Sequence, residues 1–210
     1  YLENSFIVAN SAENYIQSYY KLNGYLEDEI LDVDLIIMSI DLHSFSSYGK
    51  DRFENIEFWG KYIDYYQLAL RNNDLPRLFD FWLQGEFAYV GGFDEVSTLI
   101  KIQLEDQPVT ELINGYQPKN GNFREFEKKK ELAALRAEYH FKGSDPLDPD
   151  ILIYFIKMLD LARENNVQVV LVRFPVTAEY YSAAMKISSL EEHYEKLGSI
   201  LALNGYSSIP

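Results

Sequence analysis

Residues 33–45 read VDLIIMSIDLHSF, an apolar run that passes into polar residues at its end. The first half is apolar apart from Asp34, whereas Asp41, His43 and Ser44 follow within a few positions. An apolar run of this kind is typical of a strand that is buried on both faces of a parallel sheet. Because ligands of open parallel sheets bind beyond the carboxyl ends of the strands, these polar residues mark a candidate site.

The sequence around this run predicts an α/β fold. Apolar runs predict three strands, at 5–9, 33–40 and 167–174. Apolar residues at steps of three and four predict three helices, over 14–29, 150–165 and 188–203. Apolar strands that alternate with helices are typical of a three-layer α/β/α arrangement, in which helices cover both faces of a parallel sheet. Residues 169–172 should then all be buried.

Helix boundaries and the domain organisation follow from capping residues and composition. Asp148 and Pro149 predict an N-cap and a first helical residue, and Ser188 with Glu191 has the spacing of a capping box. We expect a single α/β domain over 1–210, incomplete at both ends, with a helical insertion at about 47–145.

The composition excludes several classes of partner and site. A formal net charge of −14 argues against sequence-independent binding of nucleic acid or anionic lipid, because both require a basic surface. No apolar run is long enough to span a membrane. The absence of cysteine excludes disulfides, thiolate metal sites and a Cys nucleophile. No G-x-G-x-x-G, P-loop, H-E-x-x-H or G-x-S-x-G motif occurs, so we expect no cofactor and no metal.

Polar residues follow all three predicted strands, and these are the candidate cleft-lining residues. They are Asn10, Ser11, Glu13 and Asn14 after the first strand, Asp41, His43 and Ser44 after the second, and Arg173 and Tyr180 after the third.

Most of these candidates also have a purely structural interpretation. Asp41 and Ser44 can cap a turn, His43 can bond a backbone carbonyl, and Arg173 can pair with a nearby acid. Asn10 and Asn14 suit loop and helix-cap geometry. The remaining histidines, His140 and His193, fall on charged helix faces, where we expect them to be exposed.

The order of these segments resembles the SGNH (GDSL-type) hydrolase-like superfamily. The likeness rests on 6–22, 33–45 and 148–181, and it is nearest to bacterial cell-envelope O-acetylation proteins of the alginate-acetylation and DltD-like kinds. It covers about 1–48 and 146–210. The resemblance implies a flavodoxin-like or SGNH-like parallel sheet and acyl chemistry on a cell-surface polysaccharide.

The resemblance also implies that the catalytic residues lie elsewhere. The family's nucleophilic Ser and its Asp/His pair fall before and after the segments matched here, so the catalytic residues of this chain stay unknown. Aligning residues 39–42 with the family's G-x-N-D motif puts Asp41 where an oxyanion-stabilising Asn is expected. A carboxylate there repels a developing oxyanion unless it is protonated or turned away.

Three functional hypotheses follow. The first is an acyl hydrolase or acyltransferase, exported or anchored at the bacterial cell envelope, with a surface polysaccharide or acyl donor as partner; a cytoplasmic location stays open. The second is a non-enzymatic α/β scaffold that binds a glycan or protein through its aromatic helical insertion. The third makes Asp41 and His43 a local acid–base pair.

Overall fold

The computed structural model describes residues 13–27, 33–50, 79, 82–83 and 128–206. The chain divides into two compact units, Tyr1–Glu13 with Phe53–Phe123, and Asn14–Arg52 with Arg124–Pro210. The second, which we call the α/β unit, holds most of the described residues. In the first unit, the rings of Phe79 and Trp82 lie 5.6 Å apart. The predicted strand at 5–9 and most of the predicted insertion lie outside the described residues.

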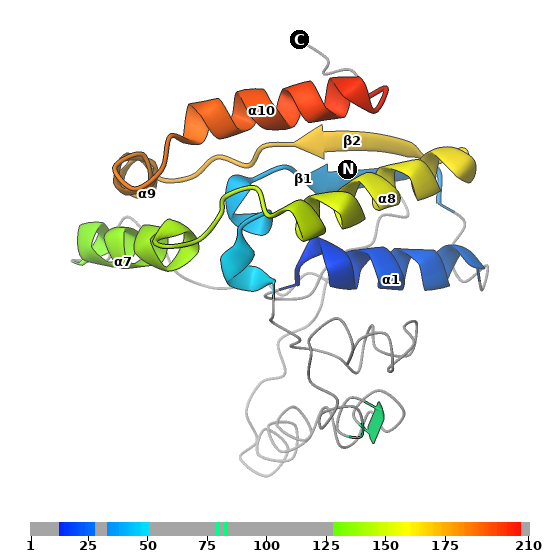
Figure 1. Ribbon diagram of the computed structural model, residues 1–210, viewed down its shortest axis with the longest axis horizontal. Coiled ribbons are helices and arrows are strands. Elements are labelled where there is room, and N and C mark those ends of the chain that lie inside the picture. The colour runs from blue at the N-terminus through cyan, green and yellow to red at the C-terminus, as the bar shows by residue number, and fades with distance from the viewer. Residues whose placement is uncertain (1–12, 28–32, 51–78, 80–81, 84–127, 207–210) are drawn as a thin grey trace, which may run out of the picture. The chain divides into compact units, whose positions relative to one another are not determined.

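The α/β unit alternates helices with two short strands (Figure 1). In chain order its elements are α1 (Tyr15–Glu27), β1 (Leu35–Ser39), the 3₁₀ turns η1 (Leu42–Ser44) and η2 (Ser47–Gly49), α7 (Lys129–Phe141), α8 (Pro149–Glu164), β2 (Gln168–Val172), α9 (Ala178–Ala184) and α10 (Leu190–Leu203). The predicted helices at 14–29, 150–165 and 188–203 are therefore confirmed as α1, α8 and α10. None of these described helices is long and apolar enough to cross a bilayer.

β1 and β2 pair in parallel, with Leu35 opposite Gln168 and Ser39 opposite Val172. This confirms the predicted parallel arrangement of the two strands. It also directs both carboxyl ends to the same edge of the sheet, where the polar residues after each strand meet.

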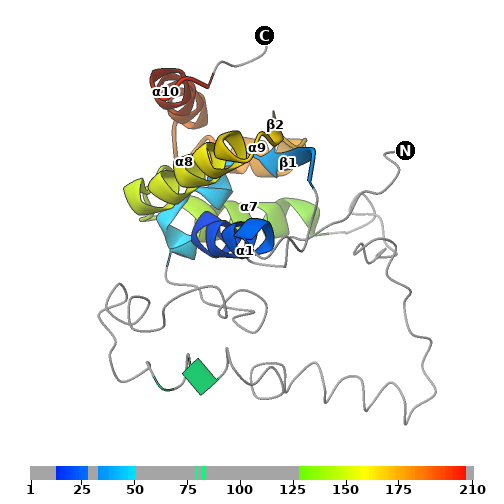
Figure 2. The same cartoon turned by 90° about the vertical axis from the view of Figure 1, so that its right-hand side faces the viewer.

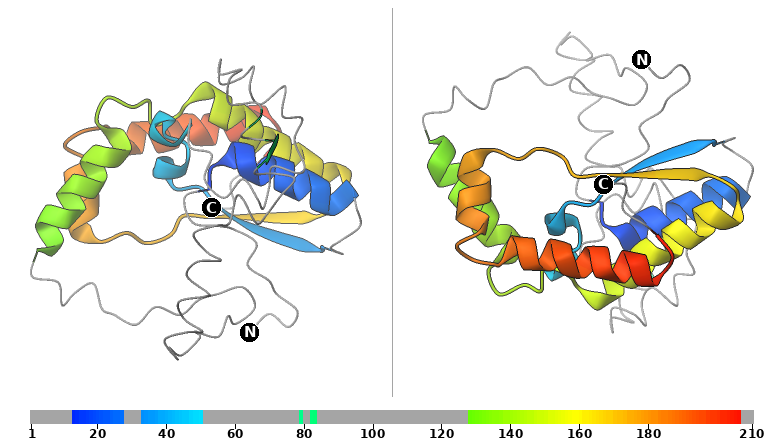
Figure 3. Two further views of the ribbon diagram at one scale, coloured as in Figure 1. Left: turned by 90° about the horizontal axis from the view of Figure 1, so that it is seen from below. Right: turned by 90° about the horizontal axis from the view of Figure 1, so that it is seen from above.

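The described helices cover only one face of this strand pair. Figure 3 shows α1, α8 and α10 on the same side of β1 and β2, and α8 lies between α1 and α10 (Figure 2). Met38 on the covered face is 6% exposed, whereas Ile37 and Val170 are 52% and 42% exposed. The prediction that residues 169–172 are all buried is therefore wrong: Val170 is exposed because no described helix packs on its face, and Val169, Leu171 and Val172 are only partly buried.

Three aromatic rings form the centre of the core. Tyr15 from α1, Phe45 after η1 and Phe155 from α8 lie with ring centroids 4.8 to 4.9 Å apart in all three pairs. Their tilted and edge-on arrangements are the favourable ones for aromatic rings, worth about 0.5–1.5 kcal/mol per pair beyond the area they bury. This cluster fixes the helices α1 and α8 against the loop that carries the polar residues.

Side-chain caps begin two of the helices. The Asp148 carboxylate accepts hydrogen bonds from the backbone N–H groups of Asp150 (2.9 Å) and Ile151 (3.2 Å), which confirms the predicted cap of α8. Asn14 caps α1 in the same way, accepting from Ile16 N–H at 3.0 Å. The predicted capping box of α10 is wrong, because the N-cap is Ser189 and its side chain makes no capping bond.

Backbone and side-chain bonds join residues 45–50 to residues 140–148. Ser46 Oγ donates to the His140 carbonyl at 2.6 Å, and the Ser47 N–H donates to the Asp145 carbonyl at 2.9 Å. The Lys50 ammonium lies 3.4 Å from the Asp148 carboxylate. The helix α7, which the sequence analysis assigned to the insertion, thereby lies within the α/β unit, where Phe141 is part of the core.

Candidate functional site

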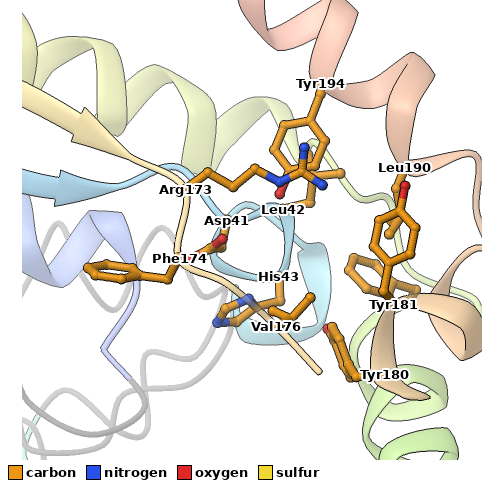
Figure 4. A pocket seen from close by; sticks show the side chains of 11 residues that line it. Asp41, Leu42, His43, Arg173, Phe174, Val176, Tyr180, Tyr181, Leu190 and Tyr194 are labelled. Carbon is orange, nitrogen blue, oxygen red and sulfur yellow. The ribbon is translucent and has the colours of Figure 1, made fainter. Parts of the chain in front are cut away.

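A pocket lies beyond the carboxyl ends of β1 and β2 (Figure 4). It is lined by residues that follow the two strands and by residues of α7, α9 and α10: Asp41, Leu42, His43, Phe141, Arg173, Phe174, Val176, Tyr180, Tyr181, Leu190 and Tyr194. Four of the residues that the sequence singled out as cleft-lining, Asp41, His43, Arg173 and Tyr180, are among them. The pocket therefore combines apolar, aromatic and charged groups at the edge where ligands of parallel sheets bind.

The polar residues after β1 are held by a short turn. Asp41 is buried, and its carboxylate accepts a hydrogen bond from Ser39 Oγ at 2.7 Å. Its backbone carbonyl accepts from the Ser44 N–H at 2.9 Å, which closes η1. No hydrogen bond joins the side chains of Asp41 and His43, so these two residues do not form the direct acid–base contact that the third hypothesis requires.

His43 packs against a second histidine that comes from α7. The rings of His43 and His140 are stacked, 5.0 Å apart with an interplanar angle of 15°. His140 Nδ1 lies 2.6 Å from the Tyr180 hydroxyl, within hydrogen-bond distance. The prediction of an exposed His140 is wrong, since His140 is 4% exposed and lies on the face of α7 that packs into the unit. His193 is half-buried rather than exposed.

The guanidinium of Arg173 forms the other side of the pocket. It lies over the ring of Tyr194, 3.9 Å from the ring centroid, and 3.9 Å from the carboxylate of Glu191. Glu191 also accepts a hydrogen bond from the Tyr181 hydroxyl. Arg173 thus pairs with an acid, as in its structural interpretation, and it also contributes a positive charge to the pocket wall.

Burial determines the protonation of the titratable groups in the pocket. Burial lowers the pKa of His43, an effect that Asp41 opposes and Arg136 reinforces, so the imidazole is neutral at pH 7. Burial raises the pKa of Tyr180 and of Tyr194, which both keep their protons. The pocket therefore presents neutral hydrogen-bonding groups beside the charges of Asp41 and Arg173.

The other predicted residues have different positions. Asn10 and Ser11 lie outside the described residues, and Glu13 belongs to the other unit. Asn14 caps α1, and its Nδ2 donates to the Gly49 carbonyl at 2.8 Å, so its described contacts are structural. Ser44 belongs to η1 and does not line the pocket.

Sequence reasoning missed Tyr181, Tyr194 and His140 as residues of this region. Tyr194 lies on α10 and reaches the pocket from there. The spacing of residues in the sequence did contain a signal for the burial of His140. The buried residues of α7 are Ala133, Ala137, His140 and Phe141. Their spacing of four, three and one residues defines one helix face, and that face includes the histidine.

The described residues offer neither a metal centre nor a nucleophilic serine at the pocket. In the described part of the chain, no group of three or more His, Asp or Glu side chains is arranged to hold a metal ion. None of the lining residues is a serine. The arrangement can bind a ligand through an arginine, neutral hydrogen-bond groups and aromatic faces.

Comparison with known proteins gives no relative: no family model, no curated protein sequence and no solved structure matches this chain.

Proposed function

We propose that this chain is an SGNH hydrolase-like protein of the bacterial cell envelope, exported or membrane-anchored, that binds acyl esters of a surface polysaccharide. The observation that carries the proposal is the convergence of residues after β1 and β2 on one pocket. In this proposal β1 and β2 belong to a larger parallel sheet of the three-layer α/β/α type.

The chemistry of the pocket suits a sugar ligand. Tyr180, Tyr181, Tyr194 and Phe174 offer aromatic surface, which packs well against the apolar faces of sugar rings. Arg173 offers a planar donor that matches a carboxylate or a carbonyl group. A ring face beside a fixed guanidinium is a suitable combination for an acidic, acylated polysaccharide.

The position of Asp41 favours a role for the pocket in ligand binding over a role in oxyanion stabilisation. Its carboxylate accepts from Ser39 Oγ and remains close to the pocket, where it would repel a developing negative charge. In the proposed function, the pocket therefore holds the acylated sugar, and a nucleophile and its base come from parts of the fold outside the described residues.

Isothermal titration calorimetry of the full chain tests this proposal. The two ligands are mannuronate hexamers, one O-acetylated and one de-O-acetylated. We expect the chain to bind the acetylated hexamer more tightly, and Arg173→Gln to weaken that binding about tenfold, the effect of one lost charge-assisted hydrogen bond. Lys142→Gln is the matched control, because it also removes a positive charge but lies just after α7, where the Lys142 side chain is exposed and pairs with Glu138. Equal binding of both hexamers, or equal effects of the two variants, would contradict the proposal.

A second candidate is a binding protein without acyl-transfer activity, the class of the second hypothesis. It is favoured by the pocket lining, which contains no serine. The predicted aromatic insertion of that hypothesis lies outside the described residues. We expect residues 1–210 to give no turnover of p-nitrophenyl acetate above the buffer rate, because nucleophile, base and oxyanion hole must lie within hydrogen-bond reach of one another. Turnover that His43→Ala abolishes would restore His43 as a catalytic base.

A further inference from the structure

Several neighbours determine the position of Tyr180 in the pocket. Its backbone lies in the first turn of α9, where its N–H donates to Thr177 Oγ1 at 3.3 Å. The adjacent Glu179 lies 3.6 Å from the Lys129 ammonium of α7, which ties the two helices together. The phenol ring itself lines the pocket, and in Figure 4 its hydroxyl end is directed towards His43 and Val176.

His140 fixes the hydroxyl of Tyr180 from outside the pocket. The Nδ1–Oη distance is 2.6 Å, and His140 does not line the pocket itself. The imidazole packs against the rings of His43 at 5.0 Å and Tyr48 at 4.9 Å. Ser46 Oγ holds the backbone carbonyl of His140. An imidazole that is confined in this way cannot rotate freely, so it holds the phenol oxygen at one position.

The hydrogen bond can leave the phenol proton available to a ligand. When the Nδ1–H of His140 donates to Tyr180 Oη, the phenol proton can point into the pocket. Burial raises the pKa of Tyr180, so this proton is retained at neutral pH. The pocket then contains a neutral O–H donor in a position set by α7.

The surroundings of this donor suit an uncharged acyl group. Apolar side chains of the lining, Leu42, Phe141, Val176 and Leu190, provide contacts for the methyl of an acetyl group. The charged side chains that line the pocket are those of Asp41 and Arg173, and the guanidinium of Arg173 already lies 3.9 Å from the Glu191 carboxylate. The Asp41 carboxylate therefore repels a free carboxylate more than it repels a neutral ester carbonyl.

We propose that Tyr180 donates a hydrogen bond to the acyl carbonyl oxygen of the ligand, and that His140 is the residue that positions it. This inference rests on the proposed function, since it assigns recognition of the acyl group within the same pocket. The sugar ring and its charge are recognised separately, by Arg173 and Tyr194.

The test compares the two mannuronate hexamers by calorimetry, on the full chain and its variants. Tyr180→Phe keeps the ring and removes the hydroxyl, so the preference for the acetylated hexamer should fall about 3- to 10-fold, the effect of one hydrogen bond. Binding of the de-O-acetylated hexamer should weaken less, because this hexamer lacks the carbonyl oxygen that accepts the bond. Tyr139→Phe is the matched control, because Tyr139 is an exposed residue of α7 next to His140 and does not line the pocket. It should leave both affinities unchanged.

Two variants of His140 test the positioning role. His140→Leu removes the ring nitrogen and should lower the preference as much as Tyr180→Phe does. His140→Gln supplies an amide N–H donor and should restore part of the preference, which a purely structural role would not predict. Circular dichroism and denaturant melts establish whether each variant is folded. If a His140 variant does not fold, the comparison of Tyr180→Phe with the wild-type chain tests the role of the Tyr180 hydroxyl.

The outcomes separate this inference from the proposed function. A wild-type chain that prefers the acetylated hexamer, with the preference unchanged in Tyr180→Phe, overturns the role of Tyr180 and leaves the proposed function intact. A wild-type chain without any preference overturns both.

Discussion

Two pairs of helices in the α/β unit each bury a tyrosine hydroxyl, but they give it different partners. In the α1–α8 pair, Tyr15 donates to the backbone carbonyl of Ser39. In the α7–α9 pair, the hydroxyl of Tyr180 lies within hydrogen-bond distance of the His140 imidazole. Burial raises the pKa of both phenols. A backbone carbonyl is a fixed partner, whereas an imidazole can gain or lose a proton, so only the second tyrosine has a partner that can change with its surroundings.

The packing around the two tyrosines differs in the same way. Tyr15 is enclosed by the rings of Phe45 and Phe155 and is nearly inaccessible to solvent. Tyr180 is half-buried and borders the pocket. The comparison indicates that the α1–α8 pair supplies stability, whereas the α7–α9 pair contributes Phe141, Tyr180 and Tyr181 to the candidate site.

The largest expected effect is on the apolar core of the α1–α8 pair. Phe155→Ala removes a fully buried ring that contacts both Tyr15 and Phe45, and we expect the free energy of unfolding to fall by about 3–5 kcal/mol. Ile153→Ala on the same helix is the control, because Ile153 is 52% exposed and should cost under about 1 kcal/mol. Urea denaturation measures both. Similar losses for the two variants would show that α8 is not packed as described.

The next effect concerns the sheet face that this helix pair covers. Met38→Ala should cost about 2–5 kcal/mol, because Met38 is buried in the core beneath the helices. Ile37→Ala, one residue away on the other face, should cost under about 1 kcal/mol. Denaturant melts of both variants test the assignment. A larger loss for Ile37→Ala would mean that the second face is also covered, as the three-layer arrangement requires.

The two tyrosines can be compared directly by removing each hydroxyl. Tyr15→Phe leaves the Ser39 carbonyl without this donor, and we expect a loss of about 1–3 kcal/mol in the free energy of unfolding, with hexamer affinity unchanged. Tyr180→Phe should cost less stability, since water can enter the pocket and replace the lost bond. The comparison fails if both variants change stability equally and neither changes the affinity for the acetylated hexamer.

The smallest expected effect is a pH dependence of the free energy of unfolding. It comes from His43, whose ring stacks on His140 of α7. Burial lowers the pKa of His43 below its usual value of 6.5. Between the lowered pKa and 6.5 the unfolded chain binds more protons than the folded chain, so stability rises with pH through this window and is lost as pH falls.

Urea midpoints measured across this window test the effect. His43→Asn should reduce the slope of stability against pH. Asp41→Asn removes the charge that holds the pKa of His43 up, so it should lower that pKa further and steepen the loss in acid. A slope that neither variant changes would exclude His43 as its source.

The sequence predicted the elements that have a strong local pattern. The apolar runs and helical periodicity located β1, β2 and the helices α1, α8 and α10, because burial of one helix face or of a strand leaves a regular spacing. The pattern could not show that Val170 is exposed, since an apolar residue on an open sheet face looks the same as one in a core.

The candidate site was partly predictable for the same reason. Asp41, His43 and Arg173 come soon after strand ends, and Tyr180 lies in the helix that follows β2, so the strand ends pointed to them. Tyr194 and His140 reach the region from the helices α10 and α7. Charged neighbours on α7 suggested an exposed His140. The spacing of Ala133 and Ala137 would have given the correct answer, because a helix face is defined by its smallest buried residues as well as its largest.

The bonds that join residues 45–50 to residues 140–148 have a consequence for the changes in sequence that the α/β unit can tolerate. They hold together two segments that lie far apart in the chain, with Ser46 and His140 separated by 94 positions, so the unit keeps these segments together with its own contacts. The entropy of closing a flexible loop grows only with the logarithm of its length, and doubling the length costs about 0.6 kcal/mol. We expect changes in the length of the chain between these two segments to cost the α/β unit little stability. This position is a natural point for the insertion or loss of whole modules during evolution.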